Sequence, residues 1–317
     1  MNIRSIFFAL VAFAALCLIP VTGAAQIFVS HFGNGLNTGR ISEYDATTGA
    51  LINPALISHL AGPDDLAVSG HTLFVADGSL GTIGKYTTSG AAVNPRLITL
   101  GNFPSRIEIS GQYLFVSESE ADRISKYTTS GKRVDVDLIP GGPFGGGLNA
   151  PWGIAISGDK LFVVNVGAGT IGEYTTSGAT INATLISGLV DPFDIAISGD
   201  KLFVTNGYNL VSEYTTSGTL VNPALISADG GVADMALSGG NLFLLVFVGF
   251  TETTINEYTT SGAPVNVPVV SEVLDQPRSL LVVPGPAAVP DASSTWTLLL
   301  LGLTATFSLR CFLRKPA

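Results

Sequence analysis

Residues 151–187, PWGIAISGDKLFVVNVGAGTIGEYTTSGATINATLIS, decide the fold. They hold four short runs rich in β-branched and aromatic residues, separated by Gly, Ser, Asp or Asn. Such runs bounded by turn residues are typical of antiparallel strands joined by short turns. We label the runs A (154–156), B (161–163), C (171–174) and D (about 181–186).

The same four-run unit recurs along the chain. A Tyr ends the C run six times, with steps of 42, 41, 47, 40 and 44 residues between successive Tyr residues. No segment of these repeats shows a sustained apolar period of 3.6 residues, which argues against helices. Four strands in each repeat of roughly 40 residues is the pattern of a β-propeller blade. The six apolar B runs begin at Ile27, Leu73, Leu114, Leu161, Leu202 and Leu242.

The two ends of the repeat region predict how the ring closes. It opens at Gln26 directly with a B run, and it finishes at 277–283 with a run that matches strand A. The sequence therefore predicts an all-β, six-bladed β-propeller with four-stranded blades over residues 26–284, in which the C-terminal strand completes blade 1. Closure of this kind leaves no open sheet edge. An open solenoid and a seven-bladed ring are the alternatives.

This repeat pattern resembles NHL-repeat and related six-bladed propellers, including the gluconolactonase and regucalcin-like group. The resemblance covers residues 26–284 and implies the fold, whereas propellers host many unrelated activities. In gluconolactonase-like propellers, Glu, Asn and Asp on the inner strands hold a metal. Only Asp64 of the corresponding residues here fits that role, so the resemblance does not imply a metal site. These residues are Asp64, Ser105, Trp152, Phe193, Ala233 and Arg278.

Composition narrows the class of protein. The chain is 46% hydrophobic and only 12% charged, against about 25% charged residues in an ordinary soluble domain. Blades packed between two neighbours explain this low charge, because both faces of their inner strands are buried. The formal charge of −9 repels phosphate backbones, so no nucleic-acid partner is expected.

Residues 1–25 are predicted to be a secretory signal peptide. Arg4 supplies the positive start, 6–19 the apolar core and 23–25 the small residues before a cleavage site. The apolar core has 14 residues, which is short for a membrane span of roughly 20. A membrane anchor or a buried helix is the alternative.

The C-terminal end, like the N-terminal one, has three parts: a polar motif, an apolar stretch and a basic finish. Residues 285–295 form a linker with a polar motif at Val289, Pro290 and Asp291, and 296–317 form an apolar tail with a basic end. This end resembles the PEP-CTERM class of bacterial sorting signals, most closely its VPDSG variant, from which it departs at Ala292-Ser293. The resemblance implies membrane retention by the tail and processing by an exosortase-like enzyme. A simple C-terminal anchor with its basic end in the cytoplasm is the alternative.

Both end segments bear on the chemistry of the mature body. They contain both cysteines, Cys17 and Cys311, so the body has no disulfide, Cys–zinc site or thiol nucleophile. Without the four basic residues and one acidic residue of the ends, 11 bases and 23 acids remain, a formal charge of −12.

The strand order assigns the loops to two faces. A–B and C–D turns share one face, and their sequences are nearly fixed as Ser-Gly-x-x and Thr-Thr-Ser-Gly. B–C and D–A loops share the other face, which holds three expected insertions: the long B–C loops at 31–40 and 246–254, and the D–A connection at 140–150. Because binding residues concentrate on variable loops of a rigid scaffold, we expect ligands on the B–C/D–A face. Tolerated slack in Gly-rich insertions is the alternative.

Polar residues also ring that face. They lie at the ends of the B strands (His31, Asp77, Glu118, Asn165 and Asn206) and at the starts of the A strands (Asp65, Arg106, Asp194, Asp234 and Ser279). Oxygen-rich rings of this kind hold Ca²⁺ or a polar ligand. The expected ligand-binding set is His31, Asp65, Asp77, Glu118, Asn165, Asp194, Asn206 and Asp234. Asp and Asn beside strand ends also cap turns, which is the structural alternative. On this alternative Arg106 neutralises Glu108.

These observations favour an exported, envelope- or matrix-associated, non-enzymatic binding module. The body lacks paired histidines and the motifs of serine hydrolases, zinc proteases, phosphate loops and EF-hands, so no catalytic residue is assigned. The expected partners are signal peptidase, an exosortase-like enzyme and an extracellular polysaccharide or envelope protein. No cofactor is expected, with Ca²⁺ as the alternative. A propeller hydrolase or lactonase with a divalent-metal site at the central channel is the alternative function.

Overall fold

In the computed structural model, residues 25–284 form a ring of six four-stranded antiparallel sheets. The structure describes residues 25–35, 37–142, 147–249, 252–271 and 274–285. The expected signal peptide, sorting motif and apolar tail lie outside these residues. Within the part of the chain that the structure describes, no helix has the length and apolar character of a membrane span.

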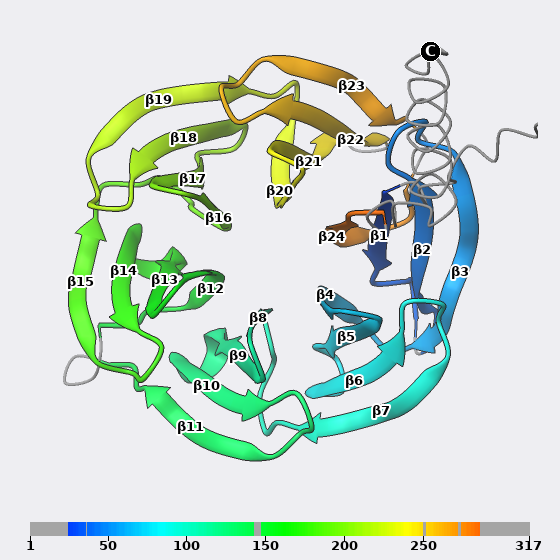
Figure 1. Ribbon diagram of the computed structural model, residues 1–317, viewed down its shortest axis with the longest axis horizontal. Coiled ribbons are helices and arrows are strands. Elements are labelled where there is room, and N and C mark those ends of the chain that lie inside the picture. The colour runs from blue at the N-terminus through cyan, green and yellow to red at the C-terminus, as the bar shows by residue number, and fades with distance from the viewer. Residues whose placement is uncertain (1–24, 36, 143–146, 250–251, 272–273, 286–317) are drawn as a thin grey trace, which may run out of the picture. The chain divides into compact units, whose positions relative to one another are not determined.

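The four strands of each blade follow one another from the axis outward, as Figure 1 shows. In blades 2 to 6 the A, B, C and D strands are consecutive in the chain. The inner A strands are β4 (Pro63–Ser69), β8 (Arg106–Ser110), β12 (Pro151–Ser157), β16 (Ile195–Ser198), β20 (Gly231–Ser238) and, for blade 1, β24 (Pro277–Val283). The B strands are β1 (Gln26–His31), β5 (Thr72–Asp77), β9 (Tyr113–Glu118), β13 (Lys160–Asn165), β17 (Lys201–Asn206) and β21 (Asn241–Val248).

The two outer strands of each blade complete the sheet. The C strands are β2 (Gly39–Asp45), β6 (Thr82–Thr87), β10 (Arg123–Thr128), β14 (Thr170–Thr175), β18 (Leu210–Thr215) and β22 (Glu252–Thr259). The D strands are β3 (Leu51–Leu60), β7 (Ala92–Thr99), β11 (Arg133–Ile139), β15 (Thr180–Ile186), β19 (Leu220–Ser227) and β23 (Pro264–Val270). Two short 3₁₀ turns, η1 (Ser119–Ala121) and η2 (Val166–Ala168), follow β9 and β13.

Ring closure is as the sequence predicts. The C-terminal strand β24 pairs antiparallel with β1, with Ile27 opposite Val282 and Val29 opposite Leu280. Blade 1 therefore takes its inner strand from the end of the body and its other three strands from the beginning. This pairing gives β1 an antiparallel neighbour on both sides, so the inner edge of β1 is covered.

The hydrophobic core lies between neighbouring blades. Phe28, Phe74, Phe115, Phe162 and Phe203 stand at the middle of the B strands and are at most 1% exposed. In one cluster, Phe203 of blade 5 packs with Met235 and Leu244 of blade 6. Each blade thus buries both faces of its inner strands against its neighbours, which is how a chain of low charge buries its apolar side chains.

One expected insertion is wrong in detail. The sequence predicts a loop over 246–254, but β21 continues to Val248 and β22 resumes at Glu252. The extra residues mainly lengthen a hairpin, because 246–248 and 252–254 remain paired across the two strands.

The Thr-Thr-Ser-Gly turns join each blade to the preceding one. In blade 5, Gly218 has a φ of +85°, and a Cβ placed there would lie 2.6 Å from the carbonyl oxygen of Leu185 in the D strand of blade 4. Gly90, Gly131, Gly178 and Gly262 repeat this approach, and Gly49 does so across the closure against Val269. Only glycine combines a left-handed backbone with such a close contact.

The same turn is also bonded within its own blade. The first Thr hydroxyl accepts the N–H four residues on, at 2.9–3.1 Å in the five turns, and the second Thr N–H of blades 2 to 5 donates to the A–B turn. The fixed sequence of these turns is therefore explained by packing between and within blades.

Candidate functional site at the axial channel

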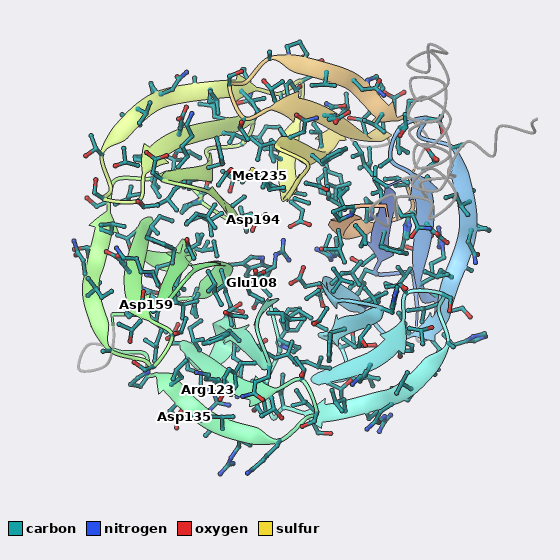
Figure 2. All side chains as sticks on the ribbon, viewed as in Figure 1. Glu108, Arg123, Asp135, Asp159, Asp194 and Met235 are labelled. Atoms are coloured by element: carbon teal, nitrogen blue, oxygen red, sulfur yellow. The ribbon has the colours of Figure 1, made fainter. Side chains whose placement is uncertain are left out.

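The starts of the inner strands meet around the axis of the ring. They enclose a channel of about 330 Å³, with polar side chains at the strand starts and aliphatic side chains farther along. Figure 2 places Glu108 and Asp194 beside the axis, while Asp135 lies at the outer edge of the ring. Of the expected site residues, Asp65, Asp194 and Asp234 line this channel together with Arg106.

The three aspartates connect neighbouring blades. Each accepts a hydrogen bond from a backbone N–H of the next inner strand. The donors are Ile107 for Asp65 (2.7 Å), Met235 for Asp194 (2.8 Å) and Leu280 for Asp234 (2.6 Å). A carboxylate that accepts a backbone N–H across an interface satisfies a donor that burial would otherwise leave unpaired.

The remaining three joints use other groups. Ser279 donates to Asp65 Oδ1 at 2.8 Å between blades 1 and 2. Ser117 Oγ donates to the carbonyl of Trp152 at 2.7 Å between blades 3 and 4. Where Gly153 stands in place of an Asp, its own N–H donates to the carbonyl of Phe193 at 3.0 Å. Every boundary between blades therefore has a polar bond near the axis.

Arg106 crosses the channel. Its Nη2 lies 2.8 Å from Asp234 Oδ1 on blade 6, the blade opposite its own in the ring, and its Nε lies 3.9 Å from Asp65 Oδ1. Burial alone would lower the pKa of Arg106, but the carboxylates of Asp234 and Asp65 outweigh it and raise the pKa overall. The expectation that Arg106 neutralises Glu108 is therefore wrong, because the guanidinium reaches across the axis to Asp234.

Burial shapes the protonation of the acids at the channel. It raises the pKa of Asp194 well above its ordinary value, and repulsion from Asp234 adds to this effect. Burial also raises the pKa of Glu108 to about 8, with a further contribution from Asp65. Asp64, which is 4% exposed, has its pKa raised to about 7 by burial, partly offset by Arg278 and Arg106.

The expected site residues at the ends of the B strands do not line the channel. Each of the five bonds to the D–A loop that enters its own blade. Asp77 accepts from the N–H groups of Ala61 and Gly62 at 2.9 and 3.1 Å, and Asn206 accepts from Val190 at 2.9 Å. The other three are Asn165 with Asn149 (3.3 Å), Glu118 with the Asn102 side chain (3.3 Å), and His31 with the Asp275 carbonyl (3.0 Å).

Blade 3 has three acidic residues at alternate positions after strand β9, Glu118, Glu120 and Asp122, but they do not converge on a common point. Glu118 is fully buried and forms an ion pair with Arg123 at 2.7 Å, and Asp122 accepts the N–H of Ala150 at 2.6 Å. Among the residues that the structure describes, no three His, Cys, Asp or Glu side chains are grouped closely enough to hold a metal ion.

Aromatic residues of blades 4 and 5 lie on the B–C/D–A face, beginning at Trp152 next to the channel residue Arg106, and sequence reasoning missed them as binding residues. Trp152 and Phe193 meet edge to face with ring centroids 6.0 Å apart, and the Arg106 guanidinium lies 5.9 Å from the Trp152 ring. Phe193 is 40% exposed and Tyr208 is 69% exposed. Val190, 61% exposed, accepts the N–H of Gly207 next to Tyr208. We call Trp152, Phe193 and Tyr208, together with the adjacent Val190, the aromatic rim.

The rim belongs to the face on which ligands are expected. Val190 and Phe193 lie in the D–A loop between β15 and β16, Tyr208 lies in the B–C loop of blade 5, and Trp152 lies at the start of β12. A comparison of the repeats could have found part of this rim. At the position just before the polar ring residue of each inner strand, blades 4 and 5 carry Trp152 and Phe193, where blades 2 and 3 carry Asp64 and Ser105.

Comparison with known proteins supports the fold alone. No family model and no curated protein matches the chain. Among solved structures, a chain of a nidogen/laminin complex superposes with a TM-score of 0.67 at 13% identity, covering 82% of this chain and 98% of that one. A putative 6-phosphogluconolactonase from Bacteroides fragilis gives 0.59 at 14% identity, covering 83% and 99%.

A virginiamycin B lyase from Staphylococcus aureus gives a TM-score of 0.51 at 20% identity, covering 68% of this chain and 71% of that one. These neighbours include a protein solved in complex with another protein as well as enzymes. The chain is thus a six-bladed β-propeller similar in fold to all three.

Proposed function

We propose that this chain is an exported propeller of the NHL-like type that acts as a non-enzymatic binding module, and that its partner contacts the B–C/D–A face. The observation that carries the proposal is the aromatic rim, where Phe193 and Tyr208 are exposed although burial of large aromatic side chains is favourable. Exposed aromatic side chains beside a rigid concave opening supply contact area at a low cost in conformational entropy.

A neutral polysaccharide suits this face. Flat aromatic rings stack against the C–H faces of sugar rings, and a neutral polymer is not repelled by a body with a formal charge of −12. The polar side chains at the B-strand ends support the same proposal, because their bonds to the D–A loops hold the binding loops in place. No specific observation on the described residues favours the alternative of a metal-dependent hydrolase or lactonase.

Affinity electrophoresis in gels containing dextran, mixed-linkage β-glucan or the exopolysaccharide of the source organism tests this proposal. The double variant Phe193→Ala with Tyr208→Ala is expected to lose retention at least tenfold, because stacking on exposed rings contributes about 1 kcal/mol or more for each ring. The matched control is Val93→Ala with Val221→Ala, which removes exposed apolar area from the outer strands. Equal retention by both variants would contradict the proposal.

We also propose that the chain is exported through its N-terminal signal and sorted to the envelope or extracellular matrix through its VPDSG-type tail. The support is the sequence pattern of residues 1–25 and 285–317. Mass spectrometry of the protein from a host with an exosortase is expected to find a start near Gln26 and no residues 296–317. An intact tail in that host would leave only a simple anchor.

A further inference from the structure

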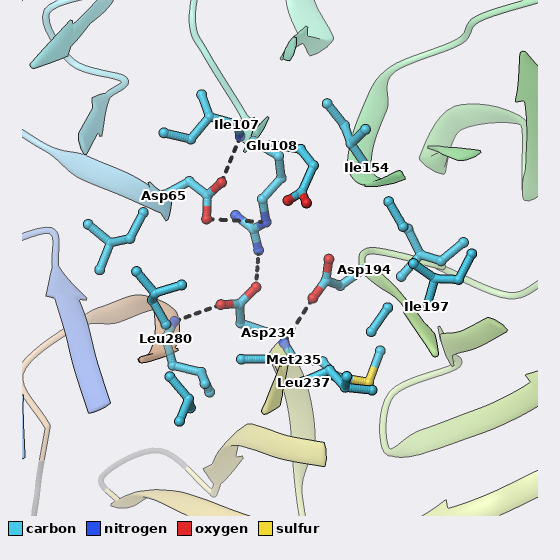
Figure 3. A pocket seen from close by; sticks show the side chains of 18 of the residues that line it. Asp65, Ile107, Glu108, Ile154, Asp194, Ile197, Asp234, Met235, Leu237 and Leu280 are labelled. Atoms are coloured by element: carbon cyan, nitrogen blue, oxygen red, sulfur yellow. Dashed lines mark hydrogen bonds and ion pairs between the residues drawn. The ribbon is translucent and has the colours of Figure 1, made fainter. Parts of the chain in front are cut away.

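The axial channel contains a carboxyl group that the fold does not explain. Glu108 stands in the inner strand β8 at the position where four other blades place alanine: Ala67, Ala155, Ala196 and Ala236. Figure 3 shows its carboxylate directed toward the middle of the channel with no bond to a neighbour. Among the described residues Glu108 has no hydrogen bond or ion pair, and its side chain is only partly exposed, so its charge lacks both a partner and full hydration.

The charges around Glu108 leave it without a cation. Asp65 of β4, Asp194 before β16 and Asp234 of β20 also face the channel, and among the residues that the structure describes Arg106 of β8 is the single cationic side chain that lines it. Strands β12 and β24 contribute only Gly153 and Ser279 at the level of this ring. Because Arg106 is already paired with Asp234 and Asp65, the channel is left strongly negative whenever its acids are ionised.

Two features of the channel lining indicate what kind of cation would neutralise its negative charge. Asp194 accepts the Met235 N–H through Oδ2 at 2.8 Å, and Figure 3 shows its other carboxylate oxygen on the side of Glu108. Next to these oxygens the wall is aliphatic, with Ile154, Ile197 and Leu237. Carboxylates beside an apolar wall suit a cation attached to a hydrocarbon chain, whereas a bare metal ion needs more converging oxygens.

We infer that the axial channel binds a primary alkylammonium group, whose N–H donors reach Glu108 and Asp194 while its alkyl chain lies against Ile154, Ile197 and Leu237. The inference goes beyond the proposed function and does not depend on the aromatic rim. A volume of about 330 Å³ accommodates a short alkylamine, since one water occupies about 30 Å³ of the liquid. The raised pKa of Glu108 adds that the cation displaces a proton on binding near neutral pH.

Calorimetric titration of the intact protein with n-butylammonium chloride, and with n-butanol as the neutral analogue, tests the inference. We expect saturable binding of the amine alone, with proton release near about pH 7 detected by comparing phosphate and HEPES buffers, neither of which contains a primary amine. The affinity is expected to rise at least about tenfold between about pH 6 and pH 8.5, because Glu108 ionises over this range while the amine stays charged.

Glu108→Ala is the decisive variant, because it installs the residue that four sibling blades carry and is therefore expected to fold. It should weaken butylammonium binding at least about tenfold and abolish its pH dependence. Glu120→Ala, which removes an exposed acid of the same blade, should bind like the parent protein. Asp194→Asn, with its unfolding temperature measured alongside, provides a second variant.

Three results would overturn the inference: no saturable amine binding at millimolar concentration, equal binding of n-butanol, or equal affinities of Glu108→Ala and Glu120→Ala. Binding of Ca²⁺ with exclusion of the amine would also overturn it and favour a metal. Because Tyr208→Ala with Phe193→Ala leaves the channel intact, that variant should keep amine binding, which separates this inference from the glycan proposal.

Discussion

One face of the ring carries Thr-Thr-Ser-Gly turns that bond to their own A–B turns and press against the preceding blade. The other carries loops that differ from blade to blade and that expose Phe193 and Tyr208 in blade 5. Both faces are built on the same six sheets. The difference shows that repetition in sequence follows repetition in packing. A turn that performs the same contact five times keeps its sequence, whereas loops free of that contact differ from blade to blade.

The largest expected effect comes from opening the ring, because both faces depend on the closure of blade 1 by β24. A chain ending at residue 276 lacks β24 and with it the bonds of Leu280 to Asp234 and of Ser279 to Asp65. We expect aggregation or loss of cooperative unfolding, because the edge of β1 becomes exposed. A chain ending at residue 284 keeps β24 and is the control. Thermal unfolding followed by circular dichroism, with gel filtration, distinguishes them, and equal melting of the two chains would contradict six-blade closure.

A substitution in one turn sharpens the assignment of the Thr-Thr-Ser-Gly face. Gly218→Ala is expected to cost about 2–4 kcal/mol in unfolding free energy, because it adds a clash with the Leu185 carbonyl to the strain of a left-handed backbone. Gly199 in the A–B turn of the same blade has a φ of +61° and open space around its Cβ position. Gly199→Ala should therefore cost only about 1 kcal/mol. Denaturant unfolding measures both, and equal costs would mean that the turn is not a contact between blades.

On the other face, the strand-end acids are expected to act through the loops they hold. Asp77→Ala leaves the N–H groups of Ala61 and Gly62 unpaired and should cost about 2–3 kcal/mol. Asp77→Asn retains one acceptor and should cost less. If Asp77→Ala keeps full stability but loses partner binding in the gel assay, Asp77 contacts the ligand directly and its structural role here is wrong.

The smallest expected effect is the dependence of stability on pH. Because burial raises the pKa values of Glu108 and Asp64 in the folded state, that state binds more protons than the unfolded chain between about pH 4.5 and 8. These groups therefore lower stability as the pH rises through that range. Glu108→Ala should melt about 2–4 °C higher than the parent protein near pH 8 and at nearly the same temperature near pH 4.5. A constant difference at all pH values would show that Glu108 is not held protonated.

The architecture was predictable because the blade pattern repeats six times and the ends carry matching strands. The residues that meet around the axis, Asp65, Asp194 and Asp234, were also predictable, since each starts an inner strand. Their bonding partners were not, because register alone does not show that Arg106 reaches Asp234 across the ring. The end of β5 illustrates the same limit: sequence places Asp77 at the ring face, but only the fold shows that its oxygens turn to the D–A loop.

Hydrogen–deuterium exchange with and without a bound polysaccharide tests the difference between the two faces most directly. The account predicts protection of the D–A loop at 187–194 and of the B–C loop at 207–209, with no change in the Thr-Thr-Ser-Gly turns at 87–90, 128–131, 175–178, 215–218 and 259–262. Protection confined to those turns, with the loops at 187–194 and 207–209 unchanged, would contradict it.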